Sequence, residues 1–230
     1  MSITKQIIDE LGVMARAGAR RVPIAATGAA SGLGATAVGI WPAGGLFNWP
    51  NRHGGEAVEV VSSSAADTST GNGLQLIEIQ VLKYTGETHT FEVELSGTSV
   101  VPLDDEVVDV VYARGTRWGS TGTAEGNIDV RTVTGSRNLL RIKTGQRDAQ
   151  AARYMIPPGL VGILRWWAVG LIGTDAAEVF LCHDWSEGLG RHVATPRPVE
   201  VMATTTSGWV TADLHPLMIL PPMTRLEFIG

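Results

Sequence analysis

Three consecutive residues have the side-chain types of a nucleophilic catalytic triad: Cys182, His183 and Asp184. In such a triad the histidine must reach both the nucleophile and the carboxylate. The apolar run just before them, 179–181, predicts a strand, in which consecutive side chains point to opposite faces. His183 would then face away from both neighbours. We therefore predict a strand entering a turn, with Cys182 as a buried structural thiol.

Metal binding is the second chemistry to consider. Four acidic residues lie close together and offer the oxygen ligands that calcium prefers: Asp104, Asp105, Glu106 and Asp109. Valines interrupt them in a strand pattern, so a charged strand entrance is the simpler interpretation. The five histidines are far apart and show no ligand spacing: His53, His89, His183, His192 and His215. A single cysteine excludes a multi-cysteine metal site, and we predict no metal and no cofactor.

The glycine-rich segment 27–34 (TGAASGLG) looks like the cofactor-binding turn of short-chain dehydrogenases. There, glycines let the backbone approach a dinucleotide phosphate at a helix N-terminus. The surrounding sequence does not fit, because a following helix would contain Gly39 and stop at Pro42. None of the three tyrosines is followed by lysine four positions later, as that family expects. A flexible arm of small residues is the simpler interpretation, and an enzyme is our weakest hypothesis.

Composition bounds the possible partners. The net charge of −5 argues against a nucleic-acid partner, because phosphate binding needs clustered basic residues. Arg16, Arg20 and Arg21 form the only basic group. No stretch approaches the roughly 18 apolar residues that span a membrane, and the N-terminus lacks the pattern of a signal peptide. We therefore expect no nucleic acid and no membrane partner.

The first 55 residues differ from the rest of the chain. Ile3, Ile7, Ile8 and Leu11 recur at helical spacing and predict one short amphipathic helix. Residues 22–55 are rich in Ala, Gly and Pro, which prevents long regular elements. The same segment contains three aromatic residues: Trp41, Phe47 and Trp49. Because an irregular segment cannot bury such residues by itself, we expect an arm that packs on a neighbouring molecule.

From Glu56 onward the hydrophobic period is two, which indicates strands. A hairpin is predicted from 74–84 to 87–95 across Thr85–Gly86, with His89 and Phe91 on one face. Further strands are expected at 107–113, 127–132, 138–143, 151–156, 160–170, 177–183, 208–213 and 224–229, with a glycine-rich loop at 115–126. No helix is expected between strands, which excludes a parallel sheet. We predict a mainly β protein: an N-terminal helix and arm (1–55) followed by one antiparallel, jelly-roll-like β-sandwich domain (56–230).

Two blocks, 54–102 and 112–159, resemble a recurrent pattern of tailed-phage virion proteins. In order, a strand leads through a Ser/Asp/Thr/Gly loop into the hairpin, and a glycine-rich turn leads to the segment Tyr154–Gly159 (YMIPPG). The resemblance implies a β-sandwich subunit present in many copies on a virion, often as a homotrimer on the head. It transfers no functional residue, because the pattern has no catalytic or ligand position.

These observations together predict a non-enzymatic capsid decoration (cement) protein. Its partners would be the major capsid protein and further copies of itself, on the virion surface after assembly in the host cytoplasm. The residues expected to bind partners are Ile3, Ile7, Ile8, Leu11, Trp41, Phe47 and Trp49. One alternative is a tail or portal-proximal structural subunit. Another is a carbohydrate-binding module that uses some of the seven tryptophans.

Overall fold

The structure is a computed structural model that describes residues 42–43, 47, 49–51, 53–171, 177–184, 197–204, 208–220 and 222–229. Side chains are described up to residue 163, and again at 220 and 222–227. Within these ranges the chain forms thirteen β-strands and no helix. The prediction of a mainly β, antiparallel protein is therefore confirmed. The predicted N-terminal helix lies outside the described residues, and the predicted division of the chain at residue 55 stays a prediction.

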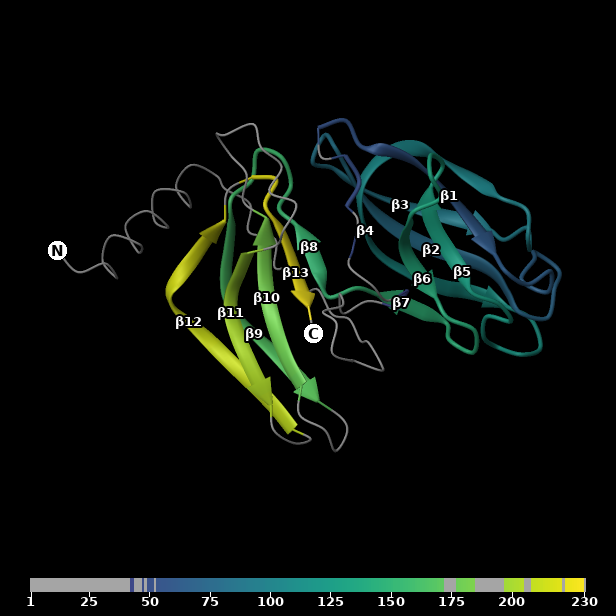
Figure 1. Cartoon of the computed structure of the whole chain (residues 1–230). Helices are drawn as coiled ribbons and strands as arrows, with labels where there is room; N and C mark the ends of the chain where they lie inside the picture. The colour runs from purple at the N-terminus through teal and green to yellow at the C-terminus, as the bar shows by residue number, and fades with distance from the viewer. Residues whose placement is uncertain are drawn as a thin grey trace.

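The strands are, in order, β1 (Glu56–Ser62), β2 (Leu74–Lys83), β3 (Thr88–Glu94), β4 (Val101–Trp118), β5 (Ile128–Thr132), β6 (Asn138–Ile142), β7 (Asp148–Gln150), β8 (Arg153–Met155), β9 (Gly162–Leu171), β10 (Ala177–Asp184), β11 (Arg197–Thr204), β12 (Gly208–Leu220) and β13 (Arg225–Ile229). Figure 1 shows β1–β7 in one half of the molecule and β9–β13 in the other, with β8 between them.

The first half is a seven-stranded antiparallel sheet with the order β3-β2-β4-β1-β5-β6, in which β7 also pairs with β4. Strand β4 is long, and its neighbours change along its length. Residues 101–107 pair with β1, whereas residues 112–114 pair with β7 while β2 occupies the other edge. Register shifts between β2 and β4 bend both strands, because bulges increase local twist. The sheet therefore curls around its own inner face.

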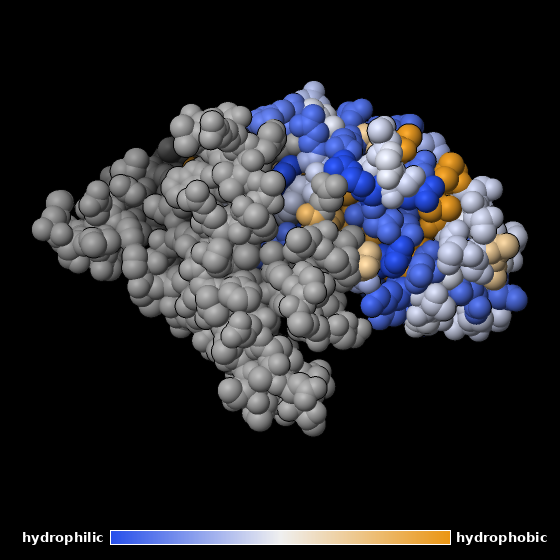
Figure 2. Space-filling model, viewed as in Figure 1, coloured by the Kyte–Doolittle hydropathy of each residue, from blue (hydrophilic) through white to orange (hydrophobic). Residues whose placement is uncertain are grey.

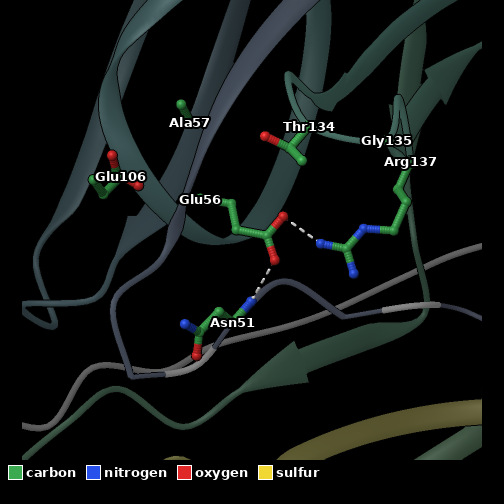
Figure 3. Close-up of a pocket in the computed structure, with 7 residues that line it drawn as sticks. All are labelled: Asn51, Glu56, Ala57, Glu106, Thr134, Gly135 and Arg137. Atoms are coloured by element: carbon green, nitrogen blue, oxygen red, sulfur yellow. Dashed lines mark hydrogen bonds and ion pairs between the residues drawn. The ribbon is translucent and has the colours of Figure 1, made fainter.

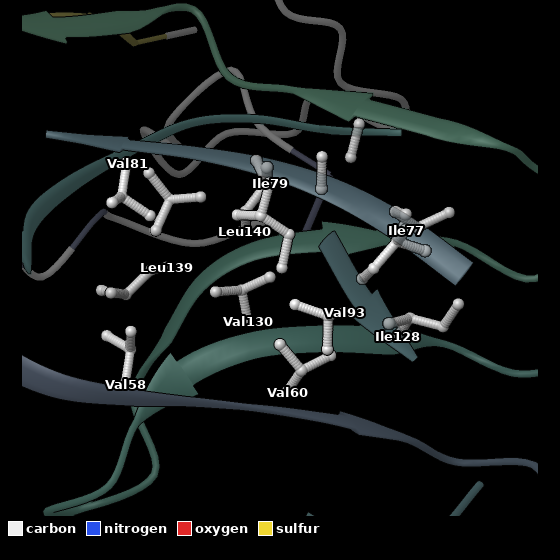
Figure 4. Packing of buried hydrophobic residues seen from close by; sticks show 14 of the residues in the cluster. Val58, Val60, Ile77, Ile79, Val81, Val93, Ile128, Val130, Leu139 and Leu140 are labelled. Carbon is white, nitrogen blue, oxygen red and sulfur yellow. The ribbon is translucent and has the colours of Figure 1, made fainter. Parts of the chain in front are cut away.

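Strict alternation places the apolar residues on that inner face. Ile77, Ile79 and Val81 of β2 are fully buried, whereas Glu78 and Gln80 between them remain partly exposed. The other strands contribute in the same way, so side chains from β1 to β7 meet in one core cluster. Figure 4 shows ten of these residues pointing toward one another inside the curl: Val58, Val60, Ile77, Ile79, Val81, Val93, Ile128, Val130, Leu139 and Leu140.

The outer face of the curled sheet has paired charges. Three ion pairs join residues that are directly opposite in the register, with N–O distances of 2.5–3.0 Å: Glu59–Arg131, Asp129–Arg141 and Glu78–Arg114. Opposite charges across neighbouring strands stabilise the pairing modestly. Because each of these cations has an anion beside it, this part of the outer face has no large field of one sign.

The second half contains a four-stranded sheet, β11-β10-β13-β8, and the two-stranded sheet β12-β9. All described pairings are antiparallel. Strand β11 is not among the strands that the sequence predicts, because its proline and acidic residue interrupt the alternation. The predicted strand at 151–156 is shorter than expected: β8 covers only its middle, and a separate short strand, β7, precedes it.

Two local predictions about the first half need correction. The expected loop beginning at Gly115 is wrong at its start, because β4 continues to Trp118. The hairpin between β2 and β3 is confirmed, but its connection is longer than two residues. Lys83 N–H donates to Glu87 O, which leaves three residues in the turn, and Gly86 has a φ of 90°. A three-residue turn of this kind needs a left-handed residue, which glycine supplies.

Candidate functional site

The two halves of the chain meet where β2 and β4 are buried on both faces. Val81 belongs to the inner core, but the adjacent Leu82 packs in a second cluster with Val108 and Met155 of β8. Trp49 and Met223 pack against this second cluster. Adjacent apolar residues on a strand therefore mark the place where the second half covers the outer face of the curled sheet.

A buried ion pair lies beside this contact. Arg153 Nε of β8 is 3.2 Å from Asp109 Oδ1 of β4, and both side chains are 2% exposed. Arg153 also donates to the carbonyl oxygens of Leu139 and Val110, and its guanidinium lies 3.6 Å from the centre of the Phe47 ring. Burial raises the pKa of the Asp109 carboxyl, although Arg153 opposes that shift. The pKa of Arg153 is lowered by the same burial.

A second carboxyl, Glu227 of β13, faces the same arginine. Glu227 is directly opposite Arg153 in the register between β13 and β8, and it is 7% exposed. Burial raises the pKa of Glu227 to about 7, against the opposing effect of Arg153. The backbone N–H of Phe47 and the indole N–H of Trp49 donate to Glu227. We call Asp109, Arg153, Glu227, Phe47 and Trp49 the junction cluster.

An open hollow of about 630 Å³ lies at the edge of the curled sheet. Figure 3 shows Glu56 at its centre, bonded to Arg137 on one side and to the backbone N–H of Asn51 on the other. Partial burial acts to raise the pKa of Glu56, but the hydrogen bonds from Arg137 and Asn51 outweigh it, so the pKa is lowered. Glu106 and Thr134 complete the rim. The hollow is wide and open, and its central charge is already neutralised within the chain.

An exposed histidine–carboxylate pair lies on β3 and β4. His89 Nδ1 is 2.7 Å from Asp105, whose other oxygen is 2.6 Å from Lys83 Nζ. Phe91 lies against the His89 ring, with the ring centroids 4.3 Å apart. A base needs a neighbouring nucleophile or substrate group within hydrogen-bond reach. Here Asp105 contacts Lys83 and His89, and the His89 ring contacts Phe91. These contacts link β2, β3 and β4 at one end of the sheet.

Exposed apolar side chains gather on one connection. Leu160, Val161 and Ile163, between β8 and the start of β9, are 51%, 49% and 38% exposed. Tyr84 in the β2–β3 turn is 46% exposed. The turn lies beside the connection, since a methyl group at Gly86 would be 3.1 Å from the Pro158 carbonyl oxygen. We call Tyr84, Leu160, Val161 and Ile163 the apolar patch. Figure 2 shows that the described part of the visible surface is mainly hydrophilic, with hydrophobic residues scattered over it.

The predicted partner-binding residues have different positions. Phe47 is 8% exposed in the inner core, and its ring meets Trp49 edge-on at 4.9 Å. Trp49 is partly buried against both clusters. The other five predicted residues lie outside the described ranges: Ile3, Ile7, Ile8, Leu11 and Trp41. The partner-binding role of all seven residues stays a prediction, but Phe47 has little surface left for another molecule.

The residues considered for catalysis or metal binding do not converge where they are described. Asp105 and Asp109 have different partners, Lys83 and Arg153, while Asp104 and Glu106 are exposed. Across the described ranges, no three His, Cys, Asp or Glu side chains come together as metal ligands would. Cys182–Asp184 lie on β10 at consecutive register positions, as predicted. The glycine-rich segment 27–34 lies outside the described residues.

The junction cluster is a site that sequence reasoning does not find. The spacing of Asp109 groups it with its acidic neighbours, and nothing in the local sequence singles out Arg153 or Glu227. One signal is present: Asp109 is the only charged residue in the run 107–111, in which all other residues are valine. A charge inside such a run indicates a buried partner. The sequence does not indicate which residue that partner is.

Comparison with known proteins found no family model, no curated protein and no solved structure that matches the chain. In the part of the chain that the structure describes, no helix has the length and apolar character needed to cross a membrane.

Proposed function

We propose that this chain is a non-enzymatic structural subunit of a tailed-phage particle, and that it acts as a decoration protein. It would bind the outside of the assembled head shell through contacts with the major capsid protein and with sister copies, as a homotrimer. The mechanism is mechanical. A protein that binds the assembled shell but not its separated subunits stabilises the shell by mass action. Assembly would take place in the host cytoplasm.

The apolar patch is the observation that carries this proposal. Single exposed apolar residues need no explanation, but a group of them, rimmed by polar surface, is typical of a protein interface. The turn and the connection that carry Tyr84 and Leu160 come from sequence positions far apart, and they are held together at Gly86 and Pro158. The core beneath is closed and the outer ion pairs are satisfied within the chain. We therefore expect the half that contains β1–β7 to act by binding another protein surface.

We further propose that the sheets form a jelly-roll-like sandwich. Support comes from β4, which pairs with different strands along its length, and from the two separate sheets of the second half. In this arrangement the segment before Phe47 is the attachment arm, with Ile3, Ile7, Ile8 and Leu11 on its apolar side.

A deletion tests the arm. Because Phe47 and Trp49 pack inside the chain, the deletion should stop at residue 41 and leave both aromatics in place. The shortened chain is expected to keep its urea unfolding midpoint but to lose trimer formation in light scattering, or co-sedimentation with shells that lack the protein. If both associations survive, the arm is not the attachment element. A full-length chain with Lys5 and Gln6 changed to Ser is the control and should associate normally.

The apolar patch has its own test. Replacing Leu160 and Val161 by Ser should weaken the same associations, while Val100→Ser, at a residue that is 48% exposed just before β4, should not. Equal effects of the two changes would rule out the assignment of this surface.

A second candidate function is favoured by the register of β9 and β12. Trp209 is opposite Gly170, Thr211 is opposite Ala168, and Asp213 is opposite Trp166. Directly opposite positions, and alternate positions along a strand, lie on one face of a strand pair. The register therefore assigns sequence positions 166, 209, 211 and 213 to one face. Two tryptophans, a threonine and an aspartate are residue types that suit sugar binding. Trp118 is less suitable, because the Arg147 guanidinium already lies 4.1 Å from its ring centre.

A glycan array with follow-up titration separates the two candidates. Millimolar or tighter binding that is lost in Trp166→Ala and Trp209→Ala, but kept in Trp118→Ala, would favour a carbohydrate-binding module. Absence of any binding would remove this candidate.

A further inference from the structure

The junction cluster joins three parts of the chain that are distant in sequence. Arg153 on β8 contacts Asp109 on β4 and is opposite Glu227 on β13. Phe47 and Trp49, which precede β1, donate to Glu227. Arg225 of β13 donates to the carbonyl oxygen of Pro50, and its guanidinium lies 5.2 Å from the centre of the Trp49 ring. Phe47, Trp49 and Pro50 are therefore held between the curled sheet and the β8–β13 pair.

Within the junction cluster one arginine faces two carboxyls, and the neighbouring Arg225 acts on Asp109 and Glu56. The deepest groups are one arginine and two carboxyls, and Arg153 forms its ion pair with Asp109. Glu227 is then a second anion near Asp109, and their repulsion adds to the effect of burial. A buried charge without its own counter-charge is costly, whereas the neutral acid is not. The protonated form of Glu227 thus fits the closed junction better than the ionised form does.

We propose that Glu227 is a protonation switch that holds Phe47, Trp49 and Pro50 in the junction. In the protonated state the junction is closed. Ionisation of Glu227 favours an open state in which water reaches the carboxylate and these three residues separate from β13. The switch does not depend on the proposed function, but it would let pH regulate an arm that binds a partner.

Other ionisable groups surround Glu227 on every neighbouring element. Asp109 comes from β4, and Arg153 and Tyr154 come from β8; burial raises the pKa of Tyr154 to about 12, so that it stays neutral. Arg225 lies two residues before Glu227 on β13 and is also near Glu56 of β1. On β10, Cys182 is opposite Glu227 and Asp184 is opposite Arg225. Burial raises the pKa of Glu227 to about 7, and it raises the pKa of the Asp109 carboxyl as well.

Hydrogen exchange of the full-length chain tests the switch, because the Phe47 N–H donates directly to Glu227. Exchange of the peptide covering 43–51 would be followed by mass spectrometry from pH 5.5 to 7.5 and corrected for the intrinsic rate. If the open state has the ordinary glutamate pKa of 4.5, its population should rise by about twentyfold over this range. A reference peptide from β2, 74–83, should show no such rise. A flat profile for 43–51, or a parallel rise in the reference peptide, would overturn the proposal.

Two variants identify the group responsible. Glu227→Gln keeps a neutral side chain of the same shape and should make the profile of 43–51 flat, whereas Glu92→Gln, at an exposed position of β3, should leave the rise intact. Trp49→Phe keeps the ring but removes an N–H that favours the charged carboxylate, so the rise should move to higher pH. If the Glu227→Gln chain folds and still shows the wild-type rise, Glu227 is not the switch. If it does not fold, an unshifted profile in Trp49→Phe overturns the proposal in the same way.

Discussion

Asp109 and Arg153 are 44 residues apart in the sequence, yet their side chains meet at 3.2 Å with both 2% exposed. The pair joins the longest strand of the curled sheet to the strand that begins the second half. Such a pair is expensive to break, because the remaining charge stays buried without its partner. We therefore expect substitutions at this pair to lower the stability of the chain strongly.

Asp109→Ala should lower the free energy of unfolding by about 3–5 kcal/mol, since it leaves Arg153 buried without its carboxylate. Urea denaturation followed by circular dichroism would measure the loss. The control is Glu94→Ala, which breaks an ion pair with Arg117 in which the glutamate side chain is 64% exposed. That change should cost less than about 1 kcal/mol. Equal costs would mean that the buried pair does not stabilise the junction.

The pH dependence of stability has a definite sign at Glu227. Its folded-state pKa of about 7 lies above the ordinary value of 4.5, so the folded chain binds more protons than the unfolded chain between those two pH values. Stability from this group is full below pH 4.5 and is lost as pH rises through 7. The loss is of the order of 3 kcal/mol.

Glu227→Gln isolates this contribution, because other carboxyls have the opposite sign. Partial burial acts to raise the pKa of Asp105, but Lys83 and His89 lower it, so the stabilisation from Asp105 is lost as pH falls. The difference in unfolding free energy between wild type and the Gln variant should change between about pH 4.5 and 7 and be nearly constant below and above that range. A constant difference over the whole range would contradict the raised pKa.

Asp67 organises the loops at one end of the curled sheet. Fully buried, it accepts hydrogen bonds from Ser62 Oγ at 2.6 Å and from the backbone N–H groups of Leu74, Glu125 and Gly126 at 2.9–3.0 Å. Asp67→Ala would leave these donors buried and unsatisfied, which should cost about 3–5 kcal/mol. The same urea experiment on the exposed Asp104→Ala should show a change below about 0.5 kcal/mol. A mild effect at Asp67 would mean that water replaces the carboxylate.

Gly71 is packed closely against the backbone of a neighbouring residue, so a larger side chain there should also destabilise the chain. A methyl group there would lie 2.0 Å from the Ala66 carbonyl oxygen, which belongs to the backbone and cannot turn aside. Gly71→Ala should therefore destabilise the chain by about 2 kcal/mol or more, as overpacking does. Gly54→Ala meets its first atom at 3.7 Å and should be nearly neutral in thermal unfolding. A neutral Gly71→Ala would show that the loop moves freely.

Most of the strands could be predicted from the sequence because one face of each strand is buried. In β2 and β5 the alternation is regular, and the predicted bounds agree with the structure to within one residue. The predicted strand bounds were wrong where both faces of a strand are buried, or where a strand changes its pairing partner along its length. The valines at 107–111 suggested one short strand, but β4 extends on both sides of them, because its two ends pair with β1 and β2.

The junction cluster could not be predicted because it depends on contacts between distant segments. Phe47 resembles an exposed anchor, since residues around it have no regular period, but the core of the curled sheet accepts its ring. In the sequence, Arg153 and Glu227 look like any charged residue in a short strand. Only the pairing of β8 with β13 shows that they lie opposite each other. Sequence periodicity gives the face of a residue, but not the segment that packs on that face.

The proposed function requires that many copies of this chain bind each head shell. If a phage encodes the chain, quantitative mass spectrometry of its purified particles would compare the amount of the chain with that of the major capsid protein. We expect hundreds of copies per particle. A dozen or fewer copies would point to a tail or portal-proximal subunit, and absence from the particles would contradict the proposed function altogether.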